Sequence, residues 1–504
     1  MSSCWRTTGC WNGAQSNTWF YPTVLLCVFG FFSKMRPIDS FFVAYLIGPD
    51  KNLTVEQVMN EILPIWTYSC LVMLIPVFLL TDYLRHKPVI VFHGLIATID
   101  LIIFIFGQGV LILQFMLFAY GIVTATEVAY YSYIYSVVSS EHYQKVTSYC
   151  RSVTLVAYTL GSVLGQVLVS VGNVSYFYLI VISLASVSVA FLSSIALPMP
   201  KRSMFFHRKD TEEVQVSPST EDVMSKSENI SPQNNPDATT FSQSPVMSDG
   251  EVFKQDVDGL VKATDHHSTL KVLLQLWSDF KDCYSSSRLL YWSIWWVLAT
   301  CGYYQSVTYV QVLWDHVEPS QNTLVYNGGA EALSNLMGAA TSFAVGYIKL
   351  DFAIWGELAL GIFSAVNSSA LYAMALSNNI WVCYTCYVVF KGSYMMLITI
   401  ATFQIAFHLS TAHYALVFGA NTALAKLLQS ILTIVVVDSR GLGLDIITQV
   451  LISGSYFAVI AGLFFIRGIY IFIQTGWKGD KWGSEVIKGN TSVSRNDIEI
   501  TEQF

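Results

Sequence analysis

Several long apolar stretches of this sequence contain an isolated ionisable side chain. The clearest examples are Glu127, Glu331 and Lys426. A charge at membrane depth is costly, about 2.5–3.5 kcal/mol or more, unless it faces a partner or a water-filled cavity. These residues therefore indicate either a buried site for a polar solute or ion pairs that hold helices in register. For Glu127 we expect Arg151 as a partner, and a purely structural pair explains that arrangement at least as well as a binding site.

The first apolar stretch is interrupted by charged residues and a proline at 34–39. Pro37 removes a backbone hydrogen bond and clashes with the preceding turn. Broken helices of this kind line transport cavities, because their freed backbone groups need water or substrate. Arg36 and Asp39 are three residues apart, so they can meet on one helix face. The alternative is that the helix ends at Ser33 and the charges lie at the membrane surface, but the apolar run 41–47 favours a cavity.

Aromatic side chains in neighbouring stretches provide flat surfaces for a ligand. The candidates are Trp66, Tyr120, Tyr158 and Tyr304. Aromatic faces combined with a few acids suit a flat, cationic or heteroaromatic solute, through stacking and cation–π contact. Aromatic residues are also common in helix packing and at membrane interfaces, so this pattern alone has low specificity.

The elements that would position these residues are membrane-spanning helices. Only 12% of the 504 residues are charged and 53% are hydrophobic, whereas soluble domains carry about 25% charged residues. A spanning helix needs about 20 apolar residues. The first part of the chain offers such runs at 19–46, 63–80, 88–106, 110–137, 147–171 and 175–197. The second part offers them at 289–313, 326–350, 354–375, 380–402, 415–437 and 446–473.

This layout predicts an all-α polytopic membrane protein with six plus six helices, as in the major facilitator superfamily. The expected parts are a cytoplasmic tail (1–18), a six-helix bundle (19–199), a largely disordered cytoplasmic linker (200–287), a second six-helix bundle (288–474) and a disordered cytoplasmic tail (475–504). The linker is too polar to bury a core. Its end, at 270–284, has the pattern of a short amphipathic helix. The loop with Asp82 and Arg85 resembles the 2–3 loop of major facilitator transporters, whose charges stabilise one conformation.

The lysines and arginines of the short loops predict the orientation. One side receives Arg85, Lys87, Lys145, the basic run 201–209, Lys349 and Lys478. The other side has little beyond Lys51 and Arg440. We therefore expect both termini to be cytoplasmic, and Asn52, in an Asn-Leu-Thr sequence, to be an external glycosylation site.

Other function classes lack their signatures. The net charge is −7 and no basic stripe indicates nucleic acid binding. We find no Walker motif, no HExxH, and no convincing Ser–His–Asp set. His408 and His413 are five residues apart, off the helical spacing that would put two metal ligands on one face. We therefore expect no enzymatic activity, no cofactor and no bound metal.

Several longer runs resemble one family, the reduced folate and thiamine carriers. They include 48–54, 64–68, 81–85, 127–136, 149–152, 197–207 and 438–441. The resemblance covers both halves, from about 19 to 473, without the linker and tail. It implies a plasma-membrane importer of thiamine, with pyridoxine as a further substrate of some members and protons as the coupling ion.

The resemblance also implies roles for individual residues. Trp66 matches the family's stacking tryptophan, Tyr120 and Tyr158 match pocket tyrosines, and Glu331 matches an acid of the second half. Glu127 and Arg151 match charged positions deep in the first half, where they would serve coupling together with Arg36.

Three positions depart from the family pattern. Asp39 stands within Arg-Pro-Ile-Asp-Ser-Phe, where the family has Arg-Pro-Ser-Glu-Pro-Phe. Leu117 replaces an acid of the fourth span, and Tyr304 replaces a pocket asparagine. Losing an acceptor for an aminopyrimidine can change discrimination by orders of magnitude. A paralogue with altered substrate choice is thus the main alternative, followed by a receptor or scaffold that does not transport. Retained buried charges argue against the scaffold.

Overall fold

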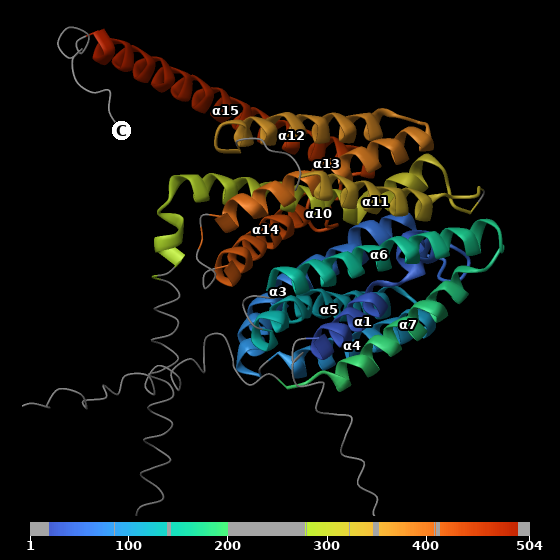
Figure 1. Ribbon diagram of the computed structural model, residues 1–504. Helices are drawn as coiled ribbons and strands as arrows, with labels where there is room; N and C mark the ends of the chain where they lie inside the picture. The colour runs from blue at the N-terminus through green and yellow to red at the C-terminus, as the bar shows by residue number, and fades with distance from the viewer. Residues whose placement is uncertain are drawn as a thin grey trace, which may run out of the picture.

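The computed structural model describes residues 20–84, 86–138, 143–199, 278, 280–321, 323–345, 352–407, 409 and 414–491. In this part of the chain, fifteen helical elements follow one another and make twelve continuous or interrupted helices, because two of these helices consist of more than one element. They form two bundles that lie side by side (Figure 1). The predicted all-α fold with six plus six helices is confirmed.

The first bundle begins with the broken helix that the sequence predicts. Its segments are α1 (Phe20–Lys34), η2 (Pro37–Phe41) and α2 (Phe42–Ile47). The helix stops because Arg36 is extended, with φ −125° and ψ 93°, and Pro37 then begins the short turn η2. The other helices are η3 (Gln57–Ile62), α3 (Leu63–Tyr83), α4 (Lys87–Phe106), α5 (Val110–Val137), α6 (Tyr143–Ser170) and α7 (Tyr176–Ala196).

The second bundle contains six longer helices. They are α10 (Ser287–Val317), α11 (Asn327–Val345), α12 (Phe352–Leu376), α13 (Ile380–Phe407), α14 (Tyr414–Val436) and α15 (Ile446–Thr491). The last helix, α15, continues past residue 475, where the predicted tail begins, to Thr491, and the rest of that tail lies outside the described residues. No proline occurs between 446 and 491 to end it. The predicted linker lies outside the described residues up to 277, and 280–284, at the end of the expected amphipathic segment, are helical.

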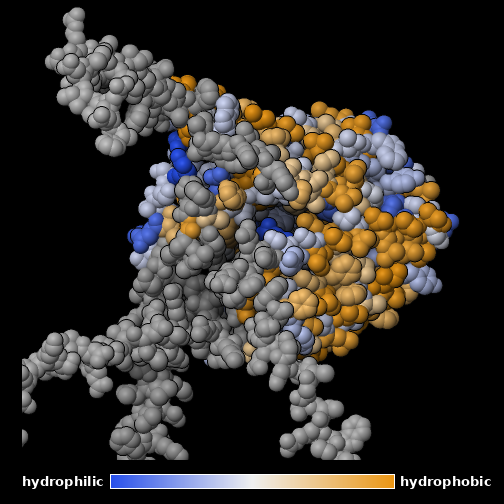
Figure 2. All heavy atoms as spheres, viewed as in Figure 1, coloured by the Kyte–Doolittle hydropathy of each residue, from blue (hydrophilic) through white to orange (hydrophobic). Residues whose placement is uncertain are grey.

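The outer surface of both bundles is apolar. Within the described residues, nine helices are long and apolar enough to cross a membrane. The surface in Figure 2 is largely hydrophobic. Large apolar side chains such as Ile75, Val459 and Ile466 are exposed. Figure 2 also shows a hollow between the bundles, with hydrophilic atoms inside it. The chain is a multi-pass membrane protein whose polar groups gather between its halves.

Hydrogen bonds between the two halves gather at one end of the molecule. The amide of Gln311 on α10 donates to the Asp39 carbonyl at 2.8 Å and accepts from the Val43 N–H at 3.2 Å. The amide of Gln166 on α6 donates to the Val325 carbonyl at 2.9 Å and accepts from the Gly329 N–H at 3.1 Å. We call this the closed end.

Each glutamine bonds a carbonyl and an N–H that are four residues apart. In a continuous α-helix such a pair would bond to each other. Here the N–H groups of Val43 and Gly329 belong to the first turns of α2 and α11, where donors lack an intrahelical partner. Further bonds join the halves, among them those from Tyr68 Oη to Asp438 Oδ2 at 2.9 Å and from Gln321 Nε2 to the Ile47 carbonyl at 2.9 Å.

Candidate substrate site

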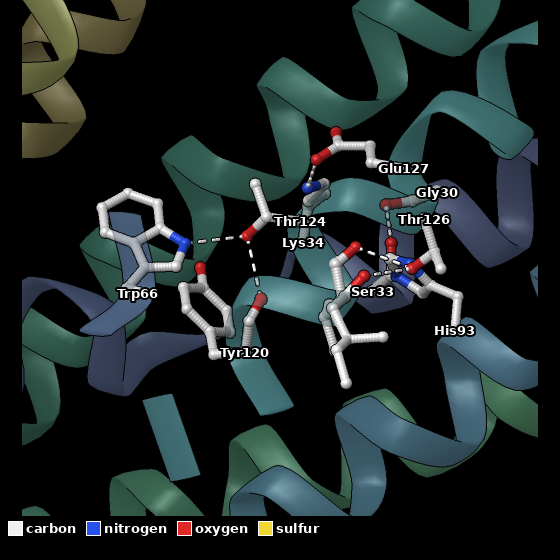
Figure 3. A network of polar contacts seen from close by, with 11 residues as sticks. Gly30, Ser33, Lys34, Trp66, His93, Tyr120, Thr124, Thr126 and Glu127 are labelled. Atoms are coloured by element: carbon white, nitrogen blue, oxygen red, sulfur yellow. Dashed lines mark hydrogen bonds and ion pairs between the residues drawn. The ribbon is translucent and has the colours of Figure 1, made fainter. Parts of the chain in front are cut away.

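Glu127 forms an ion pair inside the first bundle, but its partner differs from the predicted one. Lys34 Nζ lies 2.9 Å from Glu127 Oε2, at the end of α1 (Figure 3). Arg151 is exposed on α6, so its assignment as a buried partner of Glu127 is wrong. The packing of α1 against α5 and α6 places Lys34 at this position. Tyr158 lies beside the pair, with Lys34 Nζ 5.5 Å from its ring centroid.

The broken helix carries the second ion pair. Arg36 Nε lies 3.2 Å from Asp39 Oδ1, so these residues meet as their spacing predicts. The guanidinium of Arg36 also lies 5.0 Å from the ring centroid of Tyr120. The Asp39 carbonyl accepts the hydrogen bond from Gln311 at the closed end. This pair therefore links the aromatic residues of the site to the contact between the halves.

Trp66 and Tyr120 form an aromatic surface whose orientation is fixed by hydrogen bonds. The Trp66 Nε1–H donates to Thr124 Oγ1 at 3.0 Å, and that hydroxyl donates to the Tyr120 carbonyl at 2.9 Å (Figure 3). The Trp66 and Tyr120 ring centroids are 5.7 Å apart and the planes are inclined by 40°. Both side chains are half-buried, and the hydrogen bond to Thr124 fixes the orientation of the indole.

The acid of the second half is held by two partners that the sequence reading missed. Glu331 Oε2 lies 2.6 Å from Lys391 Nζ, and Glu331 Oε1 accepts from Tyr387 Oη at 2.7 Å. The Tyr387 ring packs edge-on against Trp314, with centroids 5.0 Å apart. Glu331 is also within electrostatic range of Asp39. The acid is thus fixed in position by two side chains of α13.

Lys426 joins aromatic residues from both halves. Its Nζ lies 3.7 Å from the ring centroid of Tyr304 on α10 and 5.3 Å from that of Trp66 on α3. The Nζ also donates to Gln429 Oε1, one turn further along α14, at 3.0 Å. Tyr304 and Trp66, which the sequence assigns to one pocket, are therefore brought together around this lysine.

Four further predicted positions are partly described by the structure. Leu117 is 3% exposed and belongs to the hydrophobic core beside Tyr120. Asn52 is exposed, in the turn that follows α2. Arg85 lies outside the described residues, and so does the side chain of Asp82, so the gating loop stays a prediction.

Two further ionisable residues belong to the same region. His93 on α4 is buried, with Nδ1 3.0 Å from Thr126 Oγ1 (Figure 3). Asp100, also on α4, is 2% exposed and lies within electrostatic range of Arg36 and Asp39. Both stand alone in an apolar run, which is the signal that identified Glu127. In the described part of the chain, no group of three His, Cys, Asp or Glu residues could hold a metal ion.

Comparisons with known proteins identify the family. The model of the reduced folate carrier family matches residues 17–452. Thiamine transporter 2 of Macaca fascicularis is 55% identical over 466 residues, which are 92% of this chain and 93% of that protein. Thiamine transporter 1 of Homo sapiens is 52% identical over 456 residues, covering 89% of this chain and 90% of that protein.

A solved structure shares the fold at low sequence identity. It is a bacterial homologue of the human lysosomal transporter Spinster, in an inward-facing and unoccupied conformation. Its TM-score is 0.58 at 10% identity, over 91% of this chain and 98% of that one. This match shows the shared fold and gives no information about substrate.

Proposed function

Because the chain belongs to the reduced folate carrier family, we propose that it is a secondary transporter of thiamine or a closely related small heteroaromatic vitamin. The observation that carries the proposal is the aromatic surface of Trp66 and Tyr120, which has the Arg36–Asp39 ion pair against Tyr120 and Lys426 of the second half beside Trp66. Stacking on an aromatic face and nearby fixed carboxylates suit a flat nitrogen heterocycle. The thiamine transporters at 52–55% identity support this substrate class.

The proposed mechanism is supported by Lys426, which brings Trp66 of the first half and Tyr304 of the second half together. A ligand on Trp66 contacts the first half, while Tyr304 and Glu331 belong to the second. Alternating access requires the halves to rock about such a site. The hydrogen bonds of Gln166 and Gln311 would then form when one end closes and break when it opens.

We also propose the membrane in which the chain lies, its orientation there and its coupling ion. We expect the closed end to face the outside of the plasma membrane and both termini to be cytoplasmic, because the basic loops would then lie inside. We expect protons to drive uptake, as the family resemblance implies. No enzymatic step is part of the proposal.

A second candidate is a carrier with altered substrate choice. Leu117 offers no hydrogen-bond acceptor where the family has an acid, and the face of Tyr304 is covered by Lys426. Such changes favour a substrate other than thiamine, for example pyridoxine. A scaffold that does not transport is disfavoured by three buried or half-buried ion pairs in the site, because buried charges have a cost without function.

Uptake of labelled thiamine and labelled pyridoxine into cells expressing the full chain tests the proposal. The wild type is measured beside Leu117→Glu, which restores the acceptor. Saturable wild-type thiamine uptake supports the first candidate. Thiamine uptake only in the variant supports the second. Uptake of neither compound by either chain, with both present at the cell surface, would contradict both.

A further inference from the structure

An arginine lies near one end of the membrane-spanning part of the last helix. This part of α15 is Ile446–Ile471. Arg467 is about 32 Å beyond Ile446, at 1.5 Å per residue, and the hydrocarbon core of a membrane is about 30 Å thick. The guanidinium of Arg467 therefore lies at the depth where the lipid headgroups begin.

The helix face that carries Arg467 is exposed and otherwise apolar. Leu463 and Tyr470 lie four residues before and three residues after Arg467, so all three share one face of α15. Leu463 and Tyr470 are each 55% exposed, and the Arg467 side chain is 30% exposed. In a multi-pass membrane protein such a face lies against lipid, so a lipid molecule can reach the guanidinium.

Arg467 uses only one of the five N–H donors of a guanidinium within the protein. Its Nε–H donates to Glu357 Oε2 on α12 at 3.1 Å. Its Cζ lies 4.0 Å from the ring centroid of Tyr291 on α10 and 5.7 Å from that of Tyr470. Among the described residues, neither Nη atom has a hydrogen-bond partner. Glu357 and Tyr291 thus hold the guanidinium in place and leave its Nη donors for a ligand.

A second arginine adds positive charge at the same end of the bundle. Arg288 on α10 is exposed and precedes Tyr291 by three residues, so both share one helix face. Arg288 and Arg467 both act electrostatically on Glu357. In the part of the chain that the structure describes, no other carboxylate lies within 4.0 Å of either arginine. Two arginines therefore share one acid, and we call Arg288, Tyr291, Glu357 and Arg467 the arginine cluster.

The apolar neighbours of the arginine cluster distinguish a lipid from a soluble anion. Ile466 and Ile469, beside Arg467 on α15, are 72% and 51% exposed, and Leu290 and Ile294 on α10 are also exposed. The acyl chains of a phospholipid would cover these side chains, whereas a soluble anion would not. The guanidinium fork matches the geometry of a phosphate, and basic pockets between helices at the cytoplasmic surface bind anionic headgroups.

We propose that the arginine cluster binds the headgroup of an anionic phospholipid. The phosphate accepts hydrogen bonds from the Nη groups of Arg467, Arg288 provides the second positive charge, and the acyl chains lie along α10 and α15. Glu357 positions Arg467 and does not touch the lipid. This inference goes beyond the proposed function, because the cluster lies on the outer surface of the second bundle and shares no residue with the substrate site.

Short-chain lipids test the proposal on the purified full-length protein in a neutral detergent. The probes are dioctanoyl phosphatidylserine, which is anionic, and dioctanoyl phosphatidylcholine, whose headgroup has no net charge. Inorganic phosphate serves as the soluble anion. Affinity is obtained from the thermal stabilisation at increasing probe concentration, for the wild type, Arg467→Lys, Arg288→Gln and Arg440→Gln. Arg440 is the matched control, an exposed arginine before α15 that also has one acidic partner, Asp438.

We expect the wild type to bind phosphatidylserine at least about 10-fold more tightly than phosphatidylcholine, since a hydrogen bond to a charged group is worth about that much or more. Arg467→Lys keeps a cation for Glu357 but loses the guanidinium fork, so it should lose most of this preference. Arg288→Gln leaves the pair of Arg467 and Glu357 intact and should weaken phosphatidylserine binding about fivefold. Arg440→Gln should behave as the wild type.

Three results would overturn the inference. The first is equal binding of the two lipids by the wild type. The second is an unchanged preference in Arg467→Lys, and if that variant does not fold, Arg288→Gln decides in the same way. The third is stabilisation by inorganic phosphate as strong as that by phosphatidylserine and lost in the same variants, because the site would then take a soluble anion. None of these results depends on uptake, so the proposed function is tested separately.

Discussion

Replacing Gln311 by alanine should loosen the closed end of the molecule. The side-chain amide of Gln311 bonds the Asp39 carbonyl and the Val43 N–H of the broken helix, across the interface between the halves. The variant removes both hydrogen bonds and leaves the covalent chain and the ion pairs of the site unchanged. When the closed end opens, water can bond the two freed backbone groups. The substitution therefore destabilises the open state less than the closed state.

The expected size of the effect follows from the number of bonds. A net hydrogen bond in a folded protein contributes about 0.5–1.5 kcal/mol. Two such bonds stabilise the closed end by about 1–3 kcal/mol, which corresponds to a shift of roughly 5–150-fold in the equilibrium between closed and open states.

A cysteine at position 329 reports on that opening. Gly329 lies in the first turn of α11, beside Gln166, and a side chain added there would meet no atom within 4 Å. A membrane-impermeant maleimide is applied from the side of the closed end. Gly329→Cys combined with Gln311→Ala should react roughly 5–150-fold faster than Gly329→Cys alone, and the chain without the reporter gives the background from native cysteines.

Gln114→Ala is the matched control. Its amide also bonds a backbone carbonyl, that of Glu61 at 2.9 Å, but both residues belong to the first half. It should leave the reaction rate of the reporter unchanged. Equal rates in the Gln311→Ala and Gln114→Ala backgrounds would refute the view that the Gln311 bonds stabilise the closed end.

Three further predictions concern single side chains. Glu331→Gln should abolish uptake at unchanged surface expression, because the amide leaves Tyr387 a hydrogen-bond acceptor but removes the negative charge. Normal uptake by this variant would contradict the proposed role of Glu331 in transport. Glu127→Gln should reduce uptake at least tenfold, whereas Arg151→Gln should have little effect in the same uptake assay. A larger loss in Arg151→Gln than in Glu127→Gln would argue against the pairing of Glu127 with Lys34. Asn52→Gln should increase electrophoretic mobility by removing one glycan, and an unchanged mobility before and after glycosidase treatment would contradict the orientation.

The sequence predicted the features that depend on neighbouring residues along the chain. Pro37 interrupts a helix wherever that helix lies, so the break in the first span could be placed to within a few residues. The pair of Arg36 and Asp39 followed from their three-residue spacing, and the short turn η2 brings them together although Arg36 itself is extended. The family resemblance is confirmed by a match over residues 17–452.

The sequence could not predict side-chain partners that depend on how each helix is rotated against its neighbours. Lys34 and Arg151 were both available to Glu127, and only the packing of α1 against α5 and α6 selects Lys34. Lys391 is an isolated charge in an apolar run, so the rule that identified Glu331 also applied to its partner. Lys426 was recognised as isolated, but its ring partners lie on α3 and α10, and nothing in the sequence brings these helices together.

Uptake by Trp66→Ala, beside Trp66→Phe, tests the central claim most directly. The assay uses labelled thiamine and labelled pyridoxine in cells, with surface expression measured in parallel. We expect saturable wild-type uptake of one compound, loss of that uptake in Trp66→Ala, and partial recovery in Trp66→Phe, which keeps a flat ring but loses the hydrogen bond to Thr124. Wild-type uptake that Trp66→Ala leaves unchanged would contradict a substrate site on this aromatic surface.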